Sequence, residues 1–170
     1  MNKVILAFLR MQSLLITGGA GFIGSHTCFV LLEAGYNLIV FDSLFNSSIE
    51  SLERLSILAG LKDGLKSNRL KFIKGDIRNK KLLDKAAKNT DAVIHLAYVN
   101  GTKYFYSRPI LVLDVAVKGI LNIIEGCIKN KVKELYLASS SEVYQTPNKI
   151  PTDEKESLKI PNIFNPRYSY

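Results

Sequence analysis

The sequence predicts an α/β fold built on a doubly wound parallel sheet. Short apolar runs alternate with helical patterns along the chain, which is typical of strand–helix–strand units. A glycine-rich turn separates the first apolar run from the first helical pattern. Acidic or hydroxyl side chains follow several of the apolar runs, and parallel strands bring such residues together at one edge of a sheet. These three observations carry the prediction.

The glycine-rich turn is Thr17–Ser25, which reads T-G-G-A-G-F-I-G-S and follows the apolar run Leu14–Ile16. Gly18, Gly21 and Gly24 allow a tight turn, close approach of a pyrophosphate to the backbone and close helix–strand packing. The helix start adds unpaired N–H groups and the positive end of a dipole. Turns also collect glycines for purely structural reasons, so it is the strand–turn–helix context that favours nucleotide binding.

An acidic residue completes this pattern. Asn37–Phe41 is a second apolar run, and Asp42 stands at its carboxyl end. A carboxylate there can accept hydrogen bonds from both hydroxyls of an adenosine ribose, and it would repel the 2′-phosphate of NADP. NAD is therefore the expected cofactor. The alternative interpretation is that Asp42 only caps the turn that follows it.

The rest of the chain continues the alternation of strands and helices. We expect strands at 70–74, 91–97 and 134–138 and helices at about 49–59, 79–88 and 109–129. Pro109 suits the first turn of the long helix, and four later prolines exclude a long helix after residue 145. Right-handed crossovers then give a Rossmann-like sheet of strand order 3-2-1-4-5, with ligand at the switch between strands 1 and 4.

Composition bounds the class of protein. A chain of 170 residues with 47% hydrophobic and 22% charged residues suits one globular domain, and no apolar run approaches the ~20 residues of a membrane span. Residues 1–10 mimic a signal sequence, but Arg10 ends their short apolar stretch, so we interpret them as an extension before a domain at 11–170. Cys28 and Cys127 fall in helical apolar patterns, as expected of reduced core thiols in a cytoplasmic protein.

The formal net charge of +8 comes from basic residues that gather in 62–88 and 129–133. Such clusters can mark a nucleic-acid surface. No aromatic residues interleave with them as stacking platforms, so we expect a solvated basic face and no nucleic-acid partner. A small anionic ligand also suits a basic protein. No His, Cys or carboxylate cluster has the spacing of metal ligands, so no metal is expected.

Five motifs are distinctive together: Thr17–Ser25, Asp42–Ser47, Gly75–Arg78, His95–Ala97 and Ser139–Tyr144. They resemble the extended short-chain dehydrogenase/reductases, which are NAD-dependent enzymes that act on nucleotide sugars. The resemblance covers about 11–170. The first hundred residues are most similar to the UDP-glucose 4-epimerases. The later motif is more similar to the nucleotide-sugar 4,6-dehydratases and UDP-glucuronate decarboxylases.

The resemblance implies a set of cofactor-binding residues, each near the carboxyl end of a strand. Gly18, Gly21, Phe22, Ile23 and Gly24 would meet the pyrophosphate, Asp42, Ser43, Asn46 and Ser47 the adenosine ribose, Asp76 and Ile77 the adenine, and Leu96, Ala97, Tyr98 and Asn100 the nicotinamide half.

The same resemblance implies the catalytic groups. Ser140 matches the family's catalytic Ser/Thr, and Tyr170 matches the tyrosine of its Tyr-x-x-x-Lys motif. A tyrosinate would remove the proton of the sugar 4-hydroxyl while hydride leaves C4 for NAD, and the 4-keto sugar would then be reduced on its other face. A dehydratase or decarboxylase would use Glu142 or a neighbour on the same ketone. The alternative is that Ser140, Glu142 and Tyr170 carry no role.

The chain departs from the family's pattern at its end. Tyr170 is the last residue, so the motif's lysine, the outer strands and the lobe that grips the nucleotide sugar are not in this sequence. Without the lysine, a tyrosine is a weak base at neutral pH. We therefore expect an incomplete NAD-binding domain with little or no turnover; a non-catalytic NAD-binding module is the alternative. The uncovered helix 109–129 would favour a homodimer.

Overall fold

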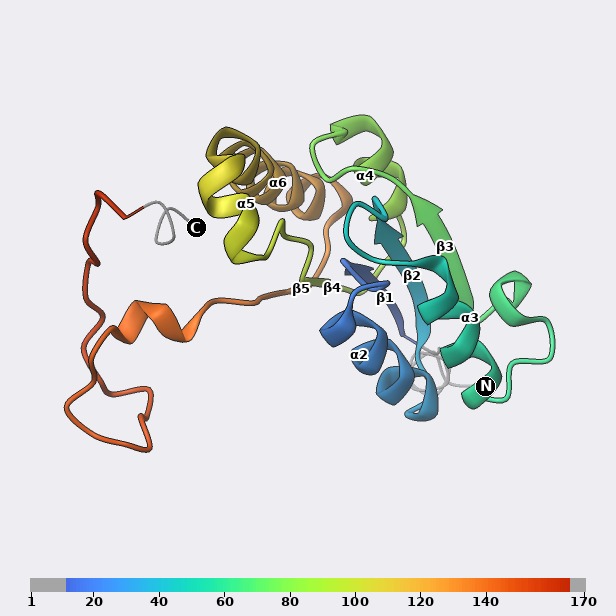
Figure 1. The fold of residues 1–170 in the computed structure, drawn as a ribbon. Helices are drawn as coiled ribbons and strands as arrows, with labels where there is room; N and C mark the ends of the chain where they lie inside the picture. Colours follow the sequence, from blue (N-terminus) through green and yellow to red (C-terminus); the bar gives the residue numbers. More distant parts are fainter. Residues whose placement is uncertain (1–11, 166–170) are drawn as a thin grey trace.

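The computed structural model describes residues 12–165. One parallel sheet holds β1 (Ser13–Thr17), β2 (Asn37–Asp42), β3 (Leu70–Lys74), β4 (Ala92–His95) and β5 (Glu134–Leu137). The α-helices are α2 (Phe22–Glu33), α3 (Ile49–Leu58), α4 (Lys80–Ala86), α5 (Thr102–Ser107) and α6 (Pro109–Asn130), and the 3-10 turns are η1 (Gly64–Lys66) and η2 (Ser141–Tyr144) (Figure 1). The expected extension at 1–10 and Tyr170 lie outside the described residues.

The strand order is β3-β2-β1-β4-β5, which confirms the order expected from the sequence. The central strand β1 pairs in parallel with β2 and with β4. Thr17, the last residue of β1, stands level with Phe41 of β2 and with His95 of β4. The loops that follow these three strands therefore leave the sheet side by side, at its carboxyl edge.

Helices cover both faces of the sheet (Figure 1). Leu15 of β1 points to the face where α4 and α6 pack, and it joins a core that includes Leu83 and Ile123. Its neighbours Leu14 and Ile16 point to the opposite face, where α2 and α3 pack. Apolar residues on both sides of one strand are expected when helices cover both faces.

The helix boundaries have local causes. Ser48 caps α3 by accepting a hydrogen bond from the Glu50 N–H, and Asn79 caps α4 by accepting from the Leu82 N–H at 3.1 Å. Pro109 opens α6, and Lys131 ends it in a left-handed conformation with φ 55°. The strand expected at 91–97 is shorter in the structure, where β4 begins at Ala92 and ends at His95. The helix α5 was not expected from the sequence.

Two apolar surfaces remain uncovered in the described structure. On α6, six apolar side chains are exposed at helical spacing: Ile110, Leu113, Val117, Leu121, Ile124 and Ile128. On the edge strand β5, Tyr136 and Leu137 are 55% and 51% exposed. After β5 the chain runs out from the sheet as an extended arm, which we define as residues 138–165 (Figure 1). The expectation that helix 109–129 carries uncovered surface is confirmed.

A polar joint ties β1 to β4 at the carboxyl edge. The Thr17 hydroxyl and His95 Nδ1 lie 2.7 Å apart and share a hydrogen bond. The Ala97 N–H also donates to the Thr17 hydroxyl, at 3.3 Å. Burial lowers the pKa of His95 to about 4, so the imidazole is neutral at pH 7.

This joint predicts a pH dependence of stability. The unfolded chain binds a proton at His95 near pH 6.5, which the folded protein accepts only near pH 4. Folding stability is therefore complete above pH 6.5 and falls as the pH drops toward 4, with a slope of at most about 1.4 kcal/mol per pH unit from this group. His95→Asn should remove that part of the slope in urea unfolding measured at a series of pH values.

His26→Asn is the matched control, because it makes the same substitution on the exposed face of α2. This variant should keep the part of the pH dependence of the unfolding free energy that His95 contributes. Parallel stability curves for wild type and His95→Asn would contradict the assignment of a neutral, buried imidazole.

Candidate functional site

The turn between β1 and α2 is built on two backbone contacts that only glycine permits. Gly18 has φ +74°, and a Cβ there would lie 2.7 Å from the Ala97 backbone nitrogen. A Cβ on Gly24 would lie 2.1 Å from the Gly18 carbonyl oxygen, a distance much shorter than any van der Waals contact. The Gly18 N–H also donates to the Phe41 carbonyl at 2.9 Å. The turn is thus pressed at once against the loop after β4, the first turn of α2 and the end of β2.

The amino terminus of α2 is open. Gly21 is its N-cap residue, no side chain caps it, and its first turn holds no acidic residue. The leading N–H groups of a helix have no intrahelical partners, and together with the helix dipole they attract anions. Phe22 and Ile23 are 83% and 67% exposed beside these groups. A twelve-residue helix with an uncapped, uncharged start above a glycine turn has the chemistry of a phosphate site.

Asp42 ends β2 next to this turn and is nearly buried, with 7% of its surface exposed. Its Oδ2 accepts from the Ala20 N–H at 3.0 Å, so the carboxylate is fastened to the glycine turn. Its Oδ1 accepts from the Leu44 N–H at 2.9 Å and from the Ser47 hydroxyl at 2.8 Å. The turn-capping role considered from the sequence is therefore real. A carboxylate has about four acceptor positions, and these bonds use three of them.

The loops after β2 and β4 meet across the end of β1. The Asn46 side-chain amide donates to the Asn100 carbonyl at 3.4 Å. The ring of Phe45 lies 5.4 Å from that of Tyr104 on α5, so the unexpected helix α5 holds the same loop from the other side. Ser43 and Asn46 are exposed on this loop. Sequence reasoning missed Tyr104 because no short motif marks a contact between a loop and a six-residue helix.

Ion pairs of Arg78 with Asp76 and Asp114 hold the loop after β3 in place. Asp76 accepts from both Nε and Nη2 of Arg78, the latter at 2.6 Å. Nη1 of Arg78 donates to Asp114 of α6 at 2.7 Å, and Nζ of Lys118 lies 2.5 Å from the same carboxylate. The hydrogen bonds from Arg78 hold the pKa of Asp76 below its usual value, and Lys118 with Arg78 does the same for the pKa of Asp114. Asp76 is therefore ionised and fixed in direction at neutral pH.

The side chain of Ile77 points into the core, against α6. It is buried, and a Cβ on Gly119 of α6 would come within 2.2 Å of it. The Ile77 carbonyl accepts from the Asn122 side chain at 2.9 Å. Of the two residues that the resemblance assigns to adenine, Asp76 thus offers a side chain, whereas Ile77 can offer only its backbone N–H.

The segment after β4 packs along the glycine turn. The Leu96 N–H donates to the Thr17 carbonyl at 3.0 Å, and the backbone of Ala97 lies against Gly18. Tyr98 is partly buried in the same segment, and Asn100 is exposed at its end. The structure therefore brings the glycine turn, Asp42 with its loop and residues 96–100 together at the carboxyl edge of the sheet, with Asp76 one strand further out. In open α/β sheets the loops at this edge form the ligand-binding crevice, and the term crevice is used below for this place.

The residues assigned to catalysis are placed differently. Ser140 caps η2 by accepting from the Glu142 N–H at 3.2 Å. Figure 1 shows η2 on the arm, which leaves the sheet beyond β5, at the edge opposite β3. The structure therefore does not gather Ser140 and Glu142 with the glycine turn. Tyr170 lies outside the described residues, so all three catalytic roles stay predictions.

Two further properties concern residues 12–165. No group of three or more His, Cys, Asp or Glu side chains in this range could hold a metal ion. No helix in the same range has both the length and the apolar character needed to cross a membrane.

Comparisons with known proteins fit this geometry. Residues 14–170 match the model of the NAD dependent epimerase/dehydratase family. The chain is 38% identical to UDP-glucose 4-epimerase 2 of Arabidopsis thaliana over 155 residues, which cover 90% of this chain and 43% of that protein. It is 39% identical to the UDP-glucose 4-epimerase of Yersinia enterocolitica over 149 residues, which cover 86% of this chain and 42% of that protein. The chain therefore spans less than half the length of these relatives.

Solved structures agree. The UDP-glucose 4-epimerase of Bifidobacterium longum, in complex with NAD+ and UDP, superposes with a TM-score of 0.81 at 32% identity over 93% of this chain and 45% of that one. The enzyme of Stenotrophomonas maltophila, with bound NAD and a formylated UDP-arabinopyranose, gives a TM-score of 0.80 at 27% identity over 94% and 45%. With its family-model match, its sheet order and its glycine turn in agreement, the chain belongs to the NAD-dependent epimerase/dehydratase family.

Proposed function

We propose that this chain supplies the NAD-binding part of a nucleotide-sugar 4-epimerase of the UDP-glucose 4-epimerase type. The observation that carries the proposal is the crevice in which Gly24 lies under the Gly18 carbonyl, beside the uncapped start of α2 and the buried carboxylate of Asp42. A Cβ on Gly18 would clash with the backbone of Ala97, and one on Gly24 would clash with the Gly18 carbonyl, so either would displace the turn over which a diphosphate would lie. The relatives that are UDP-glucose 4-epimerases support the type of enzyme.

Each part of NAD has a matching group in this crevice. The diphosphate would lie over the turn from Gly18 to Gly24, where N–H groups and the helix dipole favour negative charge. Asp42, with Ser47 beside it, would accept a hydrogen bond from the adenosine ribose. The ionised Asp76 would accept from the adenine amino group. The segment Leu96–Asn100 would lie beside the nicotinamide half.

When bound, NAD would supply the chemistry by accepting hydride from C4 of the sugar and returning it. The roles left to the protein are positional and acid–base. Tyr170 would take the proton of the 4-hydroxyl, and Ser140 would hydrogen-bond the same oxygen. A dehydratase or decarboxylase would instead use Glu142. The epimerase assignment is preferred, because the similar curated proteins named above are UDP-glucose 4-epimerases.

A non-catalytic NAD-binding module is the second candidate. It is favoured by one observation, the position of Ser140 and Glu142 on the arm rather than at the crevice. We propose that the 170-residue chain binds NAD in either case and has little or no turnover alone. A UDP-galactose to UDP-glucose assay decides between the candidates, run on the chain alone and on the chain joined to a substrate lobe from a relative. Turnover only in the joined protein supports the epimerase, and no turnover in either supports the module.

The discrimination between NAD and NADP gives a sharper prediction. Asp42 should repel the 2′-phosphate of NADP, so the chain should bind NAD at least about tenfold more tightly than NADP. Asp42→Asn keeps the shape but removes the charge, and it should narrow that ratio while weakening NAD binding. Calorimetric titration with both cofactors measures the ratio.

Asp63→Asn is the matched control, because Asp63 is an exposed carboxylate in the loop before η1. It should leave both affinities unchanged. If the wild-type chain bound NAD and NADP equally well, the proposed role of Asp42 at the adenosine ribose would be contradicted.

We further propose that two copies associate through α6. The six exposed apolar residues recur at the spacing of one helix face, and a soluble monomer rarely leaves so long a stripe in water. Sedimentation equilibrium should show a dimer that Leu121→Glu dissociates. The same experiment with Ile57→Glu, at a 75% exposed apolar residue of α3, should leave the dimer intact.

We also propose that the protein is cytoplasmic, because both of its cysteines are buried free thiols.

A further inference from the structure

Apart from Asp76, Ile77 and Arg78, the residues of the basic stretch 62–88 have no part in the crevice described above. The stretch holds ten Lys and Arg residues against three acidic ones, a surplus of seven in a chain whose net charge is +8. Arg78 and Lys80 are used in ion pairs with Asp76, Asp114 and Glu125. Seven other lysines are exposed and form no ion pair within residues 12–165: Lys62, Lys66, Lys71, Lys74, Lys81, Lys85 and Lys88. Their charge is available to a partner.

Lys71 and Lys74 belong to β3, which is the edge strand next to β2 in the sheet. The Leu38 N–H donates to the Arg69 carbonyl, and the Gly75 N–H donates to the Asp42 carbonyl. The backbone N–H and C=O groups of the odd-numbered residues in 69–75 therefore point toward β2. The backbone N–H and C=O groups of Phe72 and Lys74 therefore point outward. No strand of the described structure pairs with them.

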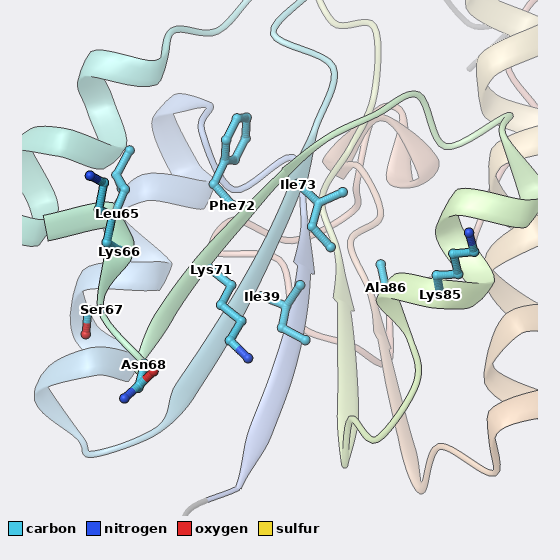
Figure 2. A pocket seen from close by; sticks show the side chains of 10 residues that line it. All are labelled: Ile39, Leu65, Lys66, Ser67, Asn68, Lys71, Phe72, Ile73, Lys85 and Ala86. Carbon is cyan, nitrogen blue, oxygen red and sulfur yellow. The ribbon is translucent and has the colours of Figure 1, made fainter. Parts of the chain in front are cut away.

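A cavity of about 420 Å³ opens along this edge. Figure 2 shows Leu65 and Phe72 on one flank of β3 and Ile39 with Ile73 on the other, facing Ala86 of α4. Lys66, Lys71 and Lys85 also line the cavity. The free edge of β3 thus combines backbone groups that pair with no strand of the described structure, apolar side chains on both faces of the sheet, and lysines that line the cavity.

An extended peptide fits each of these features. Added beside β3, its backbone would pair with the outward groups of Phe72 and Lys74, and its side chains would alternate between the two apolar flanks. The lysines select the sign of its charge. They would repel a second copy of this basic strand, which is how proteins prevent edge-to-edge association, but they would attract acidic residues.

We propose that the free edge of β3 binds an extended acidic segment of another protein as an added strand. A segment of about five residues matches the length of β3. Single-stranded nucleic acid fits the edge poorly, because Phe72 is the only aromatic residue in 62–88 and its ring is partly buried in the core. The cofactor crevice is not involved, so the proposal stands apart from the function proposed above.

A fluorescent peptide of alternating valine and glutamate is a direct probe. The chain should bind it, and Lys71→Glu/Lys85→Glu should weaken that binding at least about tenfold by reversing charge at the groove. Lys62→Glu/Lys88→Glu is the matched control, since it makes the same change of charge on exposed lysines that do not line the cavity. The control should change binding by less than about threefold.

Two further probes separate strand pairing from simple charge attraction. The same peptide N-methylated at alternate residues, made in both registers, should lose binding in the register that places methyl groups against β3. In an NMR spectrum, the amide protons of Phe72 and Lys74 should become protected from exchange when the unmethylated peptide binds.

Several results would overturn the proposal. They are no binding of the valine–glutamate peptide, equal binding of both methylated peptides and the parent, or equal loss of binding in the groove and control variants. Tighter binding of a single-stranded DNA oligonucleotide or of phosphatidylserine vesicles than of the peptide would do so too, since it would assign the basic surface to a different partner.

Discussion

The contact between Gly24 and the carbonyl of Gly18 is the constraint on which the rest of the site depends. Because no side chain separates them, α2 begins directly above the end of β1 and its first N–H groups face the crevice. The same turn receives the Asp42 carboxylate through Ala20 and the backbone of Ala97 through Gly18. The loops that follow β1, β2 and β4 are thereby fixed together at the carboxyl end of β1. The glycine turn, the uncapped start of α2 and the Asp42 carboxylate at this place favour a dinucleotide.

The fold and the centre of the site could be predicted from the sequence because they rest on local signals. The alternation of apolar runs with helical patterns gave the strand order, and the spacing of Gly18, Gly21 and Gly24 placed the turn. Asp42 was found because it directly follows an apolar run. The sequence also implied uncovered surface on α6.

Other features could not be predicted, because they join residues far apart in the chain. Thr17 and His95 are 78 residues apart, and only the parallel register of β1 and β4 brings them together. Arg78 and Asp114 are separated by 36 residues, and their ion pair depends on how α6 packs against the loop after β3. The orientation of Ile77 depends on Gly119 in the same way. Ser140 and Glu142 follow β5 in sequence, but the path of the arm decides what they meet.

The most direct test of the central claim is calorimetric titration of NAD into the wild-type chain, Gly24→Ala and Gly126→Ala. A Cβ at Gly126 on α6 meets nothing closer than 3.5 Å, so this variant makes the same substitution where there is room. Wild type and Gly126→Ala should bind NAD alike, and folded Gly24→Ala should bind at least about tenfold more weakly. A wild-type crevice that stays empty at millimolar NAD, or undiminished binding by Gly24→Ala, would contradict the proposed cofactor site.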